Sequence, residues 1–233
     1  MRIGISGTHG TGKTTLAEAL CAHLPGHLTA DEPYYLLEEE GYEFEFPPSV
    51  DDYRAMLTRS VQSLRSPPLL RAVVFDRTPL DYLAYLAATV ADPEREIDAA
   101  VIQSAIASLD LLVLTVITPE TEQALPPPEM PRLRSAMNDA LLEIVYNDPL
   151  DLCGDVPVLA LDGPLDDRLR AVLNVARTRK NTRLELLCDK SFGKCTETSH
   201  DNSQPAVTMS ATMQVTLSGP PLSIASLISS SAA

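Results

Sequence analysis

The sequence contains no tryptophan, and aromatic residues make up only 5% of its 233 residues. This scarcity argues against a stacking platform for carbohydrate or single-stranded nucleic acid. Basic side chains are also scarce: 18 lysines and arginines stand against 32 aspartates and glutamates, and the formal net charge is −14. A surface this acidic repels phosphate-rich partners, so we predict no nucleic-acid partner and no membrane partner.

Cysteine and long apolar segments are in short supply as well. The four cysteines lie far apart without a C-x-x-C pair, so neither a zinc site nor a disulfide framework is predicted. The longest apolar segment, residues 111–117, is far shorter than a membrane span. The first apolar stretch is interrupted by glycine, histidine and lysine and does not resemble a signal peptide. These features together predict a cytoplasmic protein with reduced thiols.

The composition changes near residue 187. Residues 1–187 alternate between short apolar segments, typical of buried parallel strands, and segments with helical periodicity. The expected strands are residues 2–6, 27–30, 72–75, 111–117 and 156–161. This alternation predicts an α/β fold, a three-layer doubly wound architecture with a five-stranded parallel sheet between helices.

Residues 188–233 are rich in serine and threonine and end in a low-complexity run, which predicts a tail outside the domain of residues 1–187. Within the tail, residues 207–217 alternate between apolar and polar side chains, a pattern typical of a strand. Two alternatives are left open for the tail, disorder or an added edge strand.

The most specific motif matches G-x-x-x-x-G-K-[ST] without a mismatch and follows the first expected strand. It consists of Gly7, Thr8, His9, Gly10, Thr11, Gly12, Lys13 and Thr14. In this strand–loop–helix context the motif predicts a phosphate-binding loop of P-loop NTPase type, whose backbone N–H groups surround the phosphates of a nucleoside triphosphate.

Three residues of this region have expected ligands. Lys13 is expected to reach the β- and γ-phosphates, the Thr14 hydroxyl to bind Mg²⁺, and Thr15 to contact the α-phosphate. The motif leaves a small-molecule kinase, a GTPase switch and an ATP-driven motor open. The guanine-reading N-K-x-D is absent, and no strand ends in the D-E pair of a mechanical ATPase, so both of the latter are disfavoured.

Charged residues follow the expected strands at their carboxyl ends, where open parallel sheets bind ligands. The second strand is followed by Asp31-Glu32-Pro33, and the third by the sequence D-R-T-P-L-D-Y of residues 76–82. The segments 7–14, 31–33 and 76–82 together resemble the P-loop nucleoside/nucleotide kinase superfamily, especially deoxynucleoside kinases and nicotinamide-riboside-kinase-type domains. The resemblance covers residues 1 to about 180 at the level of motif order.

The resemblance implies a role for each charged residue after the second and third strands. Glu32 is implied as the general base, or as the group that orients the acceptor hydroxyl. Asp76 is implied as a metal-binding carboxylate opposite Thr14. Arg77 is implied to contact the acceptor or the transferring phosphoryl group. The alternatives are a surface acid at Glu32 and a structural ion pair of Arg77 with Asp76 or Asp81.

Kinases of this kind close an arginine-bearing lid over the phosphates. Arg132 and Arg134 are the only basic residues between 97 and 167, and they follow a proline-rich loop after the fourth strand. They are the candidate lid arginines, with solvated helix-start arginines as the alternative, although lids of this superfamily are usually richer in arginine. Gly163, after the last strand, falls where the adenine loop is implied.

The segment 29–52 contains nine acidic residues and no basic one. Negative charge beside the acceptor favours a neutral or cationic alcohol over a nucleoside monophosphate, and a solvated acidic face is the alternative. We therefore predict an ATP- and Mg²⁺-dependent kinase that acts on a hydroxyl of a nucleoside or nucleoside-like small molecule. The alternative is a nucleotide-binding regulatory ATPase module without such an acceptor. A homodimer is left open.

Overall fold

The computed structural model describes residues 1–66, 72–89, 98–118, 122 and 130–192, with side chains as far as residue 179. The chain divides into two units, Met1–Arg177 and Thr178–Ala233. The strand expected at 207–217 lies outside the described residues, as does the tail from 193 on. The boundary expected at residue 187 therefore stays a prediction.

The first unit contains a parallel sheet of five strands in the order β2-β3-β1-β4-β5. The strands are β1 (Arg2–Gly7), β2 (Leu28–Ala30), β3 (Val73–Asp76), β4 (Leu111–Thr115) and β5 (Val158–Leu161). The α/β fold class and the five strands expected from the sequence are confirmed. Because β3 and β4 lie on opposite sides of β1, the strand order reverses at β1. Sheets of this kind bind ligands at the carboxyl ends of the strands where the order reverses.

The two edge strands differ from the expectation of uniformly buried strands. Leu28 in β2 is 54% exposed and Val158 in β5 is 36% exposed, whereas every residue of β3 and β4 is buried. Each edge strand has only one neighbouring strand, and β2 has only three residues, so their side chains are less completely covered.

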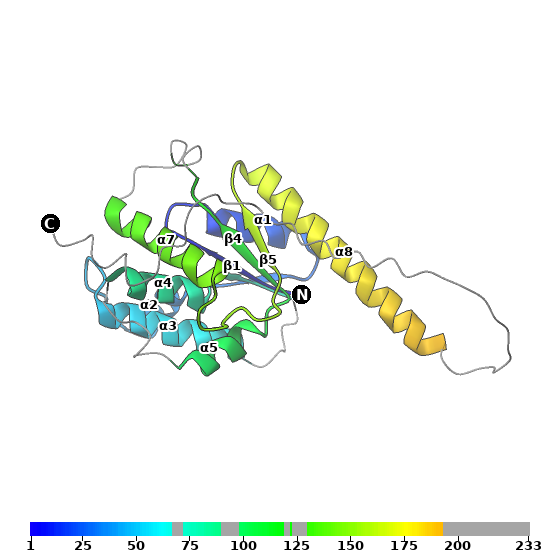
Figure 1. Cartoon of the computed structure of the whole chain (residues 1–233), viewed down its shortest axis with the longest axis horizontal. Coiled ribbons are helices and arrows are strands. Elements are labelled where there is room, and N and C mark those ends of the chain that lie inside the picture. Colours follow the sequence, from blue (N-terminus) through cyan, green and yellow to red (C-terminus); the bar gives the residue numbers. More distant parts are fainter. Residues whose placement is uncertain (67–71, 90–97, 119–121, 123–129, 193–233) are drawn as a thin grey trace. The chain divides into compact units, whose positions relative to one another are not determined.

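Helices cover both faces of the sheet (Figure 1). On one face, α1 (Lys13–His23) and the start of α8 (Leu165–Phe192) pack with β1 around Ile3, Ile5 and Leu16. On the other face lie α3 (Val50–Arg65), α4 (Pro79–Thr89), α5 (Ala99–Ile106) and α7 (Pro131–Tyr146). The three-layer architecture is therefore confirmed. The short helix α2 (Pro33–Glu39) follows β2, directly after Asp31 and Glu32.

Two helices show how the local sequence fixes these layers. The Ser49 side chain caps α3, since Ser49 Oγ accepts from the Asp52 N–H and the Asp52 carboxylate accepts from Ser49. The apolar face of α3 has helical periodicity and is buried throughout, and it consists of Tyr53, Met56, Leu57, Ser60, Val61 and Leu64. The sequence analysis did not predict α4, because residues 79–86 are buried on all sides and show no amphipathic stripe. Among the described residues, no helix combines the length and apolarity needed to cross a membrane.

Candidate functional site

The loop between β1 and α1 has the geometry expected of a phosphate-binding loop. Gly12 adopts a left-handed conformation with φ 74° and forms the N-cap of α1, which begins at Lys13. Gly7 ends β1, where a Cβ would lie only 1.9 Å from Thr115 Oγ1. A larger residue at position 7 would therefore push the loop away from β4. The helix N-terminus and the loop N–H groups together form an anion site.

Side chains from two other elements brace this loop. Asp81, at the start of α4, accepts a hydrogen bond from the Gly7 N–H at 2.9 Å. At the end of β4, Thr115 Oγ1 lies 2.9 Å from Thr11 Oγ1 and donates to Ser6 O. The sequence analysis assigned no role to Thr115, because it lies inside an expected strand rather than after it.

Lys13 is buried against the loop that it serves. Its ammonium donates to Thr8 O at 2.7 Å, and the side chain is almost completely enclosed. Burial, together with the nearby Arg77 charge, lowers the pKa of Lys13 from 10.5 to about 8. An anion bound to the loop would oppose both effects, so this lysine is suited to a phosphate ligand.

Thr14 and Asp76 form the candidate metal site predicted from the sequence. Thr14 Oγ1 donates to Asp76 Oδ2 at 2.6 Å, while Asp76 Oδ1 is buried and has no hydrogen-bond partner among the described residues. Burial raises the pKa of Asp76, with the Glu32 charge adding to the effect. Within the described residues there is no group of three or more histidine, cysteine, aspartate or glutamate side chains around a metal position. A hydroxyl and one carboxylate fit Mg²⁺, which usually takes its other ligands from phosphate and water.

Glu32 and Arg77 meet beside the phosphate-binding loop. Arg77 Nε donates to Glu32 Oε1, and Arg77 Nη1 lies 3.3 Å from Gly7 O and 3.4 Å from Asp81 Oδ1. Arg77 has φ 75°, a conformation that costs free energy for a residue other than glycine and is held by these contacts. Burial alone would lower the pKa of Arg77, but the Glu32 charge more than compensates and holds this pKa well above its usual value.

The structure shows the ion pair of Arg77 with Asp81 that the structural alternative named, while the implied contact of Arg77 with the acceptor or the phosphoryl group stays a prediction. Arg77 is ion-paired, with Glu32 and Asp81, and the pair lies beside the phosphate-binding loop at the same time. The partner Asp76 of the structural alternative is engaged by Thr14 instead.

The two candidate lid arginines are placed differently. Arg134, in the first turn of α7, is buried, and its Nη1 lies 3.8 Å from the position of a Cβ on Gly10. Arg132 is exposed, two residues earlier on the same helix. Most of the preceding proline-rich segment lies outside the described residues. Of the pair, Arg134 is therefore the one that the fold brings to the loop.

Gly163 and Thr15 are exposed. Gly163 has φ 76°, and a Cβ there would meet nothing within 4 Å. Thr15 lies in the first turn of α1, beyond Thr14. Neither makes a contact that tests its expected role in nucleotide binding.

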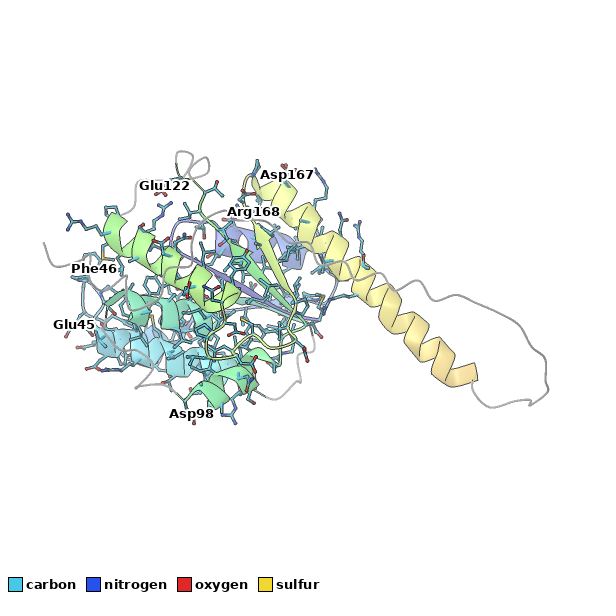
Figure 2. The ribbon with its side chains drawn as sticks, viewed as in Figure 1. Glu45, Phe46, Asp98, Glu122, Asp167 and Arg168 are labelled. Carbon is cyan, nitrogen blue, oxygen red and sulfur yellow. The ribbon has the colours of Figure 1, made fainter. Side chains whose placement is uncertain are left out.

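Arg168 contacts the loop from α8, and the sequence analysis gave it no role. Its Nη1 donates to Thr11 O at 2.7 Å, and its Nη2 lies 3.3 Å from a Cβ position on Gly12. Figure 2 shows Arg168 beside Asp167 at the start of α8. Burial lowers the pKa of Arg168. The signal in the sequence was a lone arginine in the first turn of a helix that follows the last strand.

The site thus unites a phosphate-binding loop, an oxygen pair suited to Mg²⁺ and a carboxylate–guanidinium pair at one end of the sheet. Such a set can hold a triphosphate and place an acidic side chain beside a second reactant.

Comparisons with known proteins agree with this geometry. A family model described as an AAA domain matches residues 2–153. No curated protein matches the sequence. Three solved structures illustrate the fold to which this chain is similar. One is deoxyadenosine kinase from M. mycoides with the products dCMP and a flexible dCDP, at 17% identity and TM-score 0.52, covering 76% of this chain and 100% of that one.

The second is the same enzyme with bound dATP, at 16% identity and TM-score 0.50, with coverage of 76% and 100%. The third is thymidylate kinase from Candida albicans, at 16% identity and TM-score 0.51, covering 77% of this chain and 92% of that one. At these identities the likeness establishes the fold.

Proposed function

Since the chain belongs to the AAA domain family and has the fold of P-loop nucleoside and nucleotide kinases, we propose that it is a small-molecule kinase that transfers the γ-phosphoryl group of ATP to a hydroxyl. The observation that carries this proposal is the pair formed by Glu32 and Arg77 beside the phosphate-binding loop. A carboxylate there is positioned to act on a hydroxyl rather than on the nucleotide.

Different residues of the chain bind the phosphates and the metal ion. The loop N–H groups and Lys13 hold the β- and γ-phosphates, and Arg134 adds positive charge from α7. Thr14 and Asp76 would hold Mg²⁺, which when bound supplies positive charge against the phosphate oxygens. Arg77 keeps Glu32 in place, because the two side chains are paired.

Transfer then follows from this placement. The acceptor oxygen forms a bond to the γ-phosphorus, the bond from that phosphorus to the bridging oxygen breaks, and the electron pair leaves with ADP. The proton of the acceptor hydroxyl passes to the Glu32 carboxylate. Lys13 and Arg134 stabilise the charge that spreads over the phosphoryl oxygens.

The residue after Asp76 favours a kinase over a regulatory ATPase module. In the D-E arrangement of a mechanical ATPase an acid follows the metal-binding aspartate, whereas here Arg77 follows it. The acid of this site, Glu32, comes from the residue before α2 instead. It therefore lies where a second reactant enters rather than on the strand that holds the metal.

For the acceptor we propose a nucleoside or a nucleoside-like alcohol. The support is the acidic segment 29–52, which opposes a phosphorylated acceptor, and the pairing of Arg77, whose charge is already balanced by Glu32 and Asp81. The buried rings of Tyr53 and Tyr85 stack on each other next to this pair, with centroids 4.9 Å apart.

The test is acceptor-stimulated release of ADP in a coupled assay with Mg²⁺ and ATP. Pools of nucleosides, pyridine ribosides, nucleoside monophosphates and small metabolite alcohols are compared, with Lys13→Ala as the blank. We expect one pool without phosphate groups to raise ADP release above the blank, and Glu32→Gln to lower kcat by at least about a hundredfold. ATP binding without stimulation by any pool, together with steady hydrolysis, would favour the regulatory ATPase module.

A further inference from the structure

His9, at the middle of the phosphate-binding loop, reaches across to α4. Its Nδ1 lies 3.2 Å from the Tyr85 hydroxyl. Its Nε2 is buried and has no hydrogen-bond partner among the residues that the structure describes. A buried ring nitrogen without a partner carries a free-energy cost that a bound ligand can remove.

The neighbours of Tyr85 determine which nitrogen of His9 carries the proton. The positive guanidinium of Arg77 lies over the Tyr85 ring, with Cζ 5.7 Å from the ring centroid, and its charge repels the phenolic proton. The phenolic proton is then directed to its other neighbour, His9 Nδ1, which acts as the acceptor. A neutral imidazole with Nδ1 as acceptor carries its proton on Nε2, so the unpartnered nitrogen is a donor.

The charges around His9 select the kind of oxygen that this donor would meet. Burial first, and then the charges of Arg77, Arg134 and Lys13, lower the pKa of His9 to about 4, so the ring is neutral near pH 7. Glu32 and Asp81 are both paired with Arg77, and the Tyr85 ring stacks on Tyr53. Because the charge of Arg77 is balanced by Glu32 and Asp81, the charges of Arg134 and Lys13 beside a neutral donor are what form a site for an anionic oxygen.

From this geometry we propose that His9 is a catalytic residue whose Nε2–H donates a hydrogen bond to an oxygen of the transferring phosphoryl group, with Tyr85 fixing the tautomer. The inference rests on the proposed function for the identity of the reaction. It extends that function by giving the loop a neutral, directional donor in addition to its backbone N–H groups, linked through Tyr85 to the Arg77–Glu32 pair.

Two substitutions of His9 distinguish the roles of its two ring nitrogens, because each places an amide nitrogen near the position of one of them. The amide nitrogen of a glutamine at position 9 reaches about as far as Nε2, whereas that of an asparagine reaches only about as far as Nδ1. Titration calorimetry on the full chain, with Mg²⁺ and either AMP-PNP or ADP, measures how much the γ-phosphoryl group adds to affinity. We expect His9→Asn to lower the AMP-PNP-to-ADP affinity ratio about tenfold, as for one hydrogen bond to a charged group, and His9→Gln to retain most of it.

Two further variants test the mechanism. Tyr85→Phe removes the hydroxyl that fixes the tautomer, and we expect it to lower the same ratio by a smaller factor than His9→Asn. His23→Asn is the matched control, because His23 is exposed on α1 and bonds only Ala19 O. It should leave the ratio unchanged, and unchanged ADP affinity in all variants shows that the loop is folded.

The proposal is overturned if asparagine and glutamine lower the ratio equally, if neither lowers it, or if ADP affinity falls by the same factor as AMP-PNP affinity. The calorimetric ratio requires no acceptor. A screen that finds no acceptor would therefore count against the kinase function while leaving the test of His9 intact.

Discussion

Lys13 combines a functional charge with a location that disfavours charge. Its side chain is 5% exposed, and burial lowers its pKa to about 8. Replacement by methionine keeps most of the apolar stem and removes the buried ammonium. We expect Lys13→Met to raise the free energy of unfolding of the ligand-free protein by about 1 kcal/mol while abolishing ATP binding.

Urea denaturation with and without Mg²⁺-ATP checks this expectation. The wild-type protein should gain stability from the nucleotide, and the variant should gain none. Lys180→Met, a change outside the phosphate-binding loop, serves as the control for lysine removal. A Lys13→Met protein that is less stable than wild type would mean that the bond to Thr8 O outweighs the cost of burial.

His9 also predicts how stability changes with pH. Its pKa is about 4 in the folded protein and near 6.5 when unfolded, so the unfolded chain binds more protons between these values. Stability contributed by the neutral ring is therefore complete above about pH 6.5 and is lost as the pH falls towards 4. The neighbouring charges of Arg77, Arg134 and Lys13 oppose protonation of the ring.

The measurement is the difference in the free energy of unfolding between wild type and His9→Asn, from pH 7.5 to pH 4. We expect wild type to lose more stability than the variant over this range. The same comparison with His23→Asn should give parallel curves, because His23 is exposed. Parallel curves for His9→Asn as well would show that the ring is not held neutral by the fold.

At the scale of single elements, α8 stabilises the phosphate-binding loop through Arg168. Its guanidinium donates to Thr11 O and lies against Gly12. Removal of a charged donor from a half-buried carbonyl contact costs about 1–3 kcal/mol. We expect Arg168→Ala to weaken ATP binding at least severalfold and to leave the preference among acceptors unchanged.

Arg170→Ala is the matched control, since Arg170 lies two residues further along α8, has a side chain that is 69% exposed, and pairs with Asp167. Exposed pairs of this kind contribute 0 to about 1 kcal/mol. Calorimetry with ATP should therefore separate the two variants. Equal effects would mean that α8 contributes through general packing rather than through the Arg168 contact.

The helices and strands also show which structural features could be predicted from local sequence patterns. The five strands and the loop at the end of β1 followed from apolar segments and from one motif, because both depend on short-range patterns, whereas the order of the strands in the sheet was not predicted. Helix α4 was missed because a helix that is buried on all sides has no polar face to reveal its period. Thr115 and Arg168 were missed because their contacts join residues 104 and 157 positions apart. Only the folded sheet brings such residues together.

The roles of the charged residues were predicted less completely. The pairing of Thr14 with Asp76 was expected from motif order and is present. The pairing of Arg77 with Glu32 was not expected, although both residues had been selected. A sequence shows which side chains end neighbouring strands, but the positive φ of Arg77, which turns its side chain back towards α2, depends on contacts made only in three dimensions.

At the scale of the whole molecule, the dominant property is negative charge. The chain has a formal net charge of −14, and nine of its acidic residues, Glu32 among them, fall between positions 29 and 52. Fixed charges of one sign act over about 8 Å at physiological ionic strength and over longer distances at low salt. A dianionic acceptor entering past α2 meets this field, whereas a neutral nucleoside does not.

We therefore expect nucleoside monophosphates to bind much more weakly than the corresponding nucleosides, with the difference decreasing as salt is raised. Calorimetry at about 20 mM and about 500 mM salt, in the presence of Mg²⁺-ADP, measures both affinities. Replacing Glu38, Glu39 and Glu43 by glutamine removes three exposed charges outside the Glu32–Arg77 pair. This triple variant should bind monophosphates more tightly at low salt, while its affinity for nucleosides should not change.

If wild type binds a monophosphate tightly at low salt, the acidic segment is a solvated face that does not act on the acceptor. Arg77 must then bind a phosphate despite its pairing with Glu32 and Asp81.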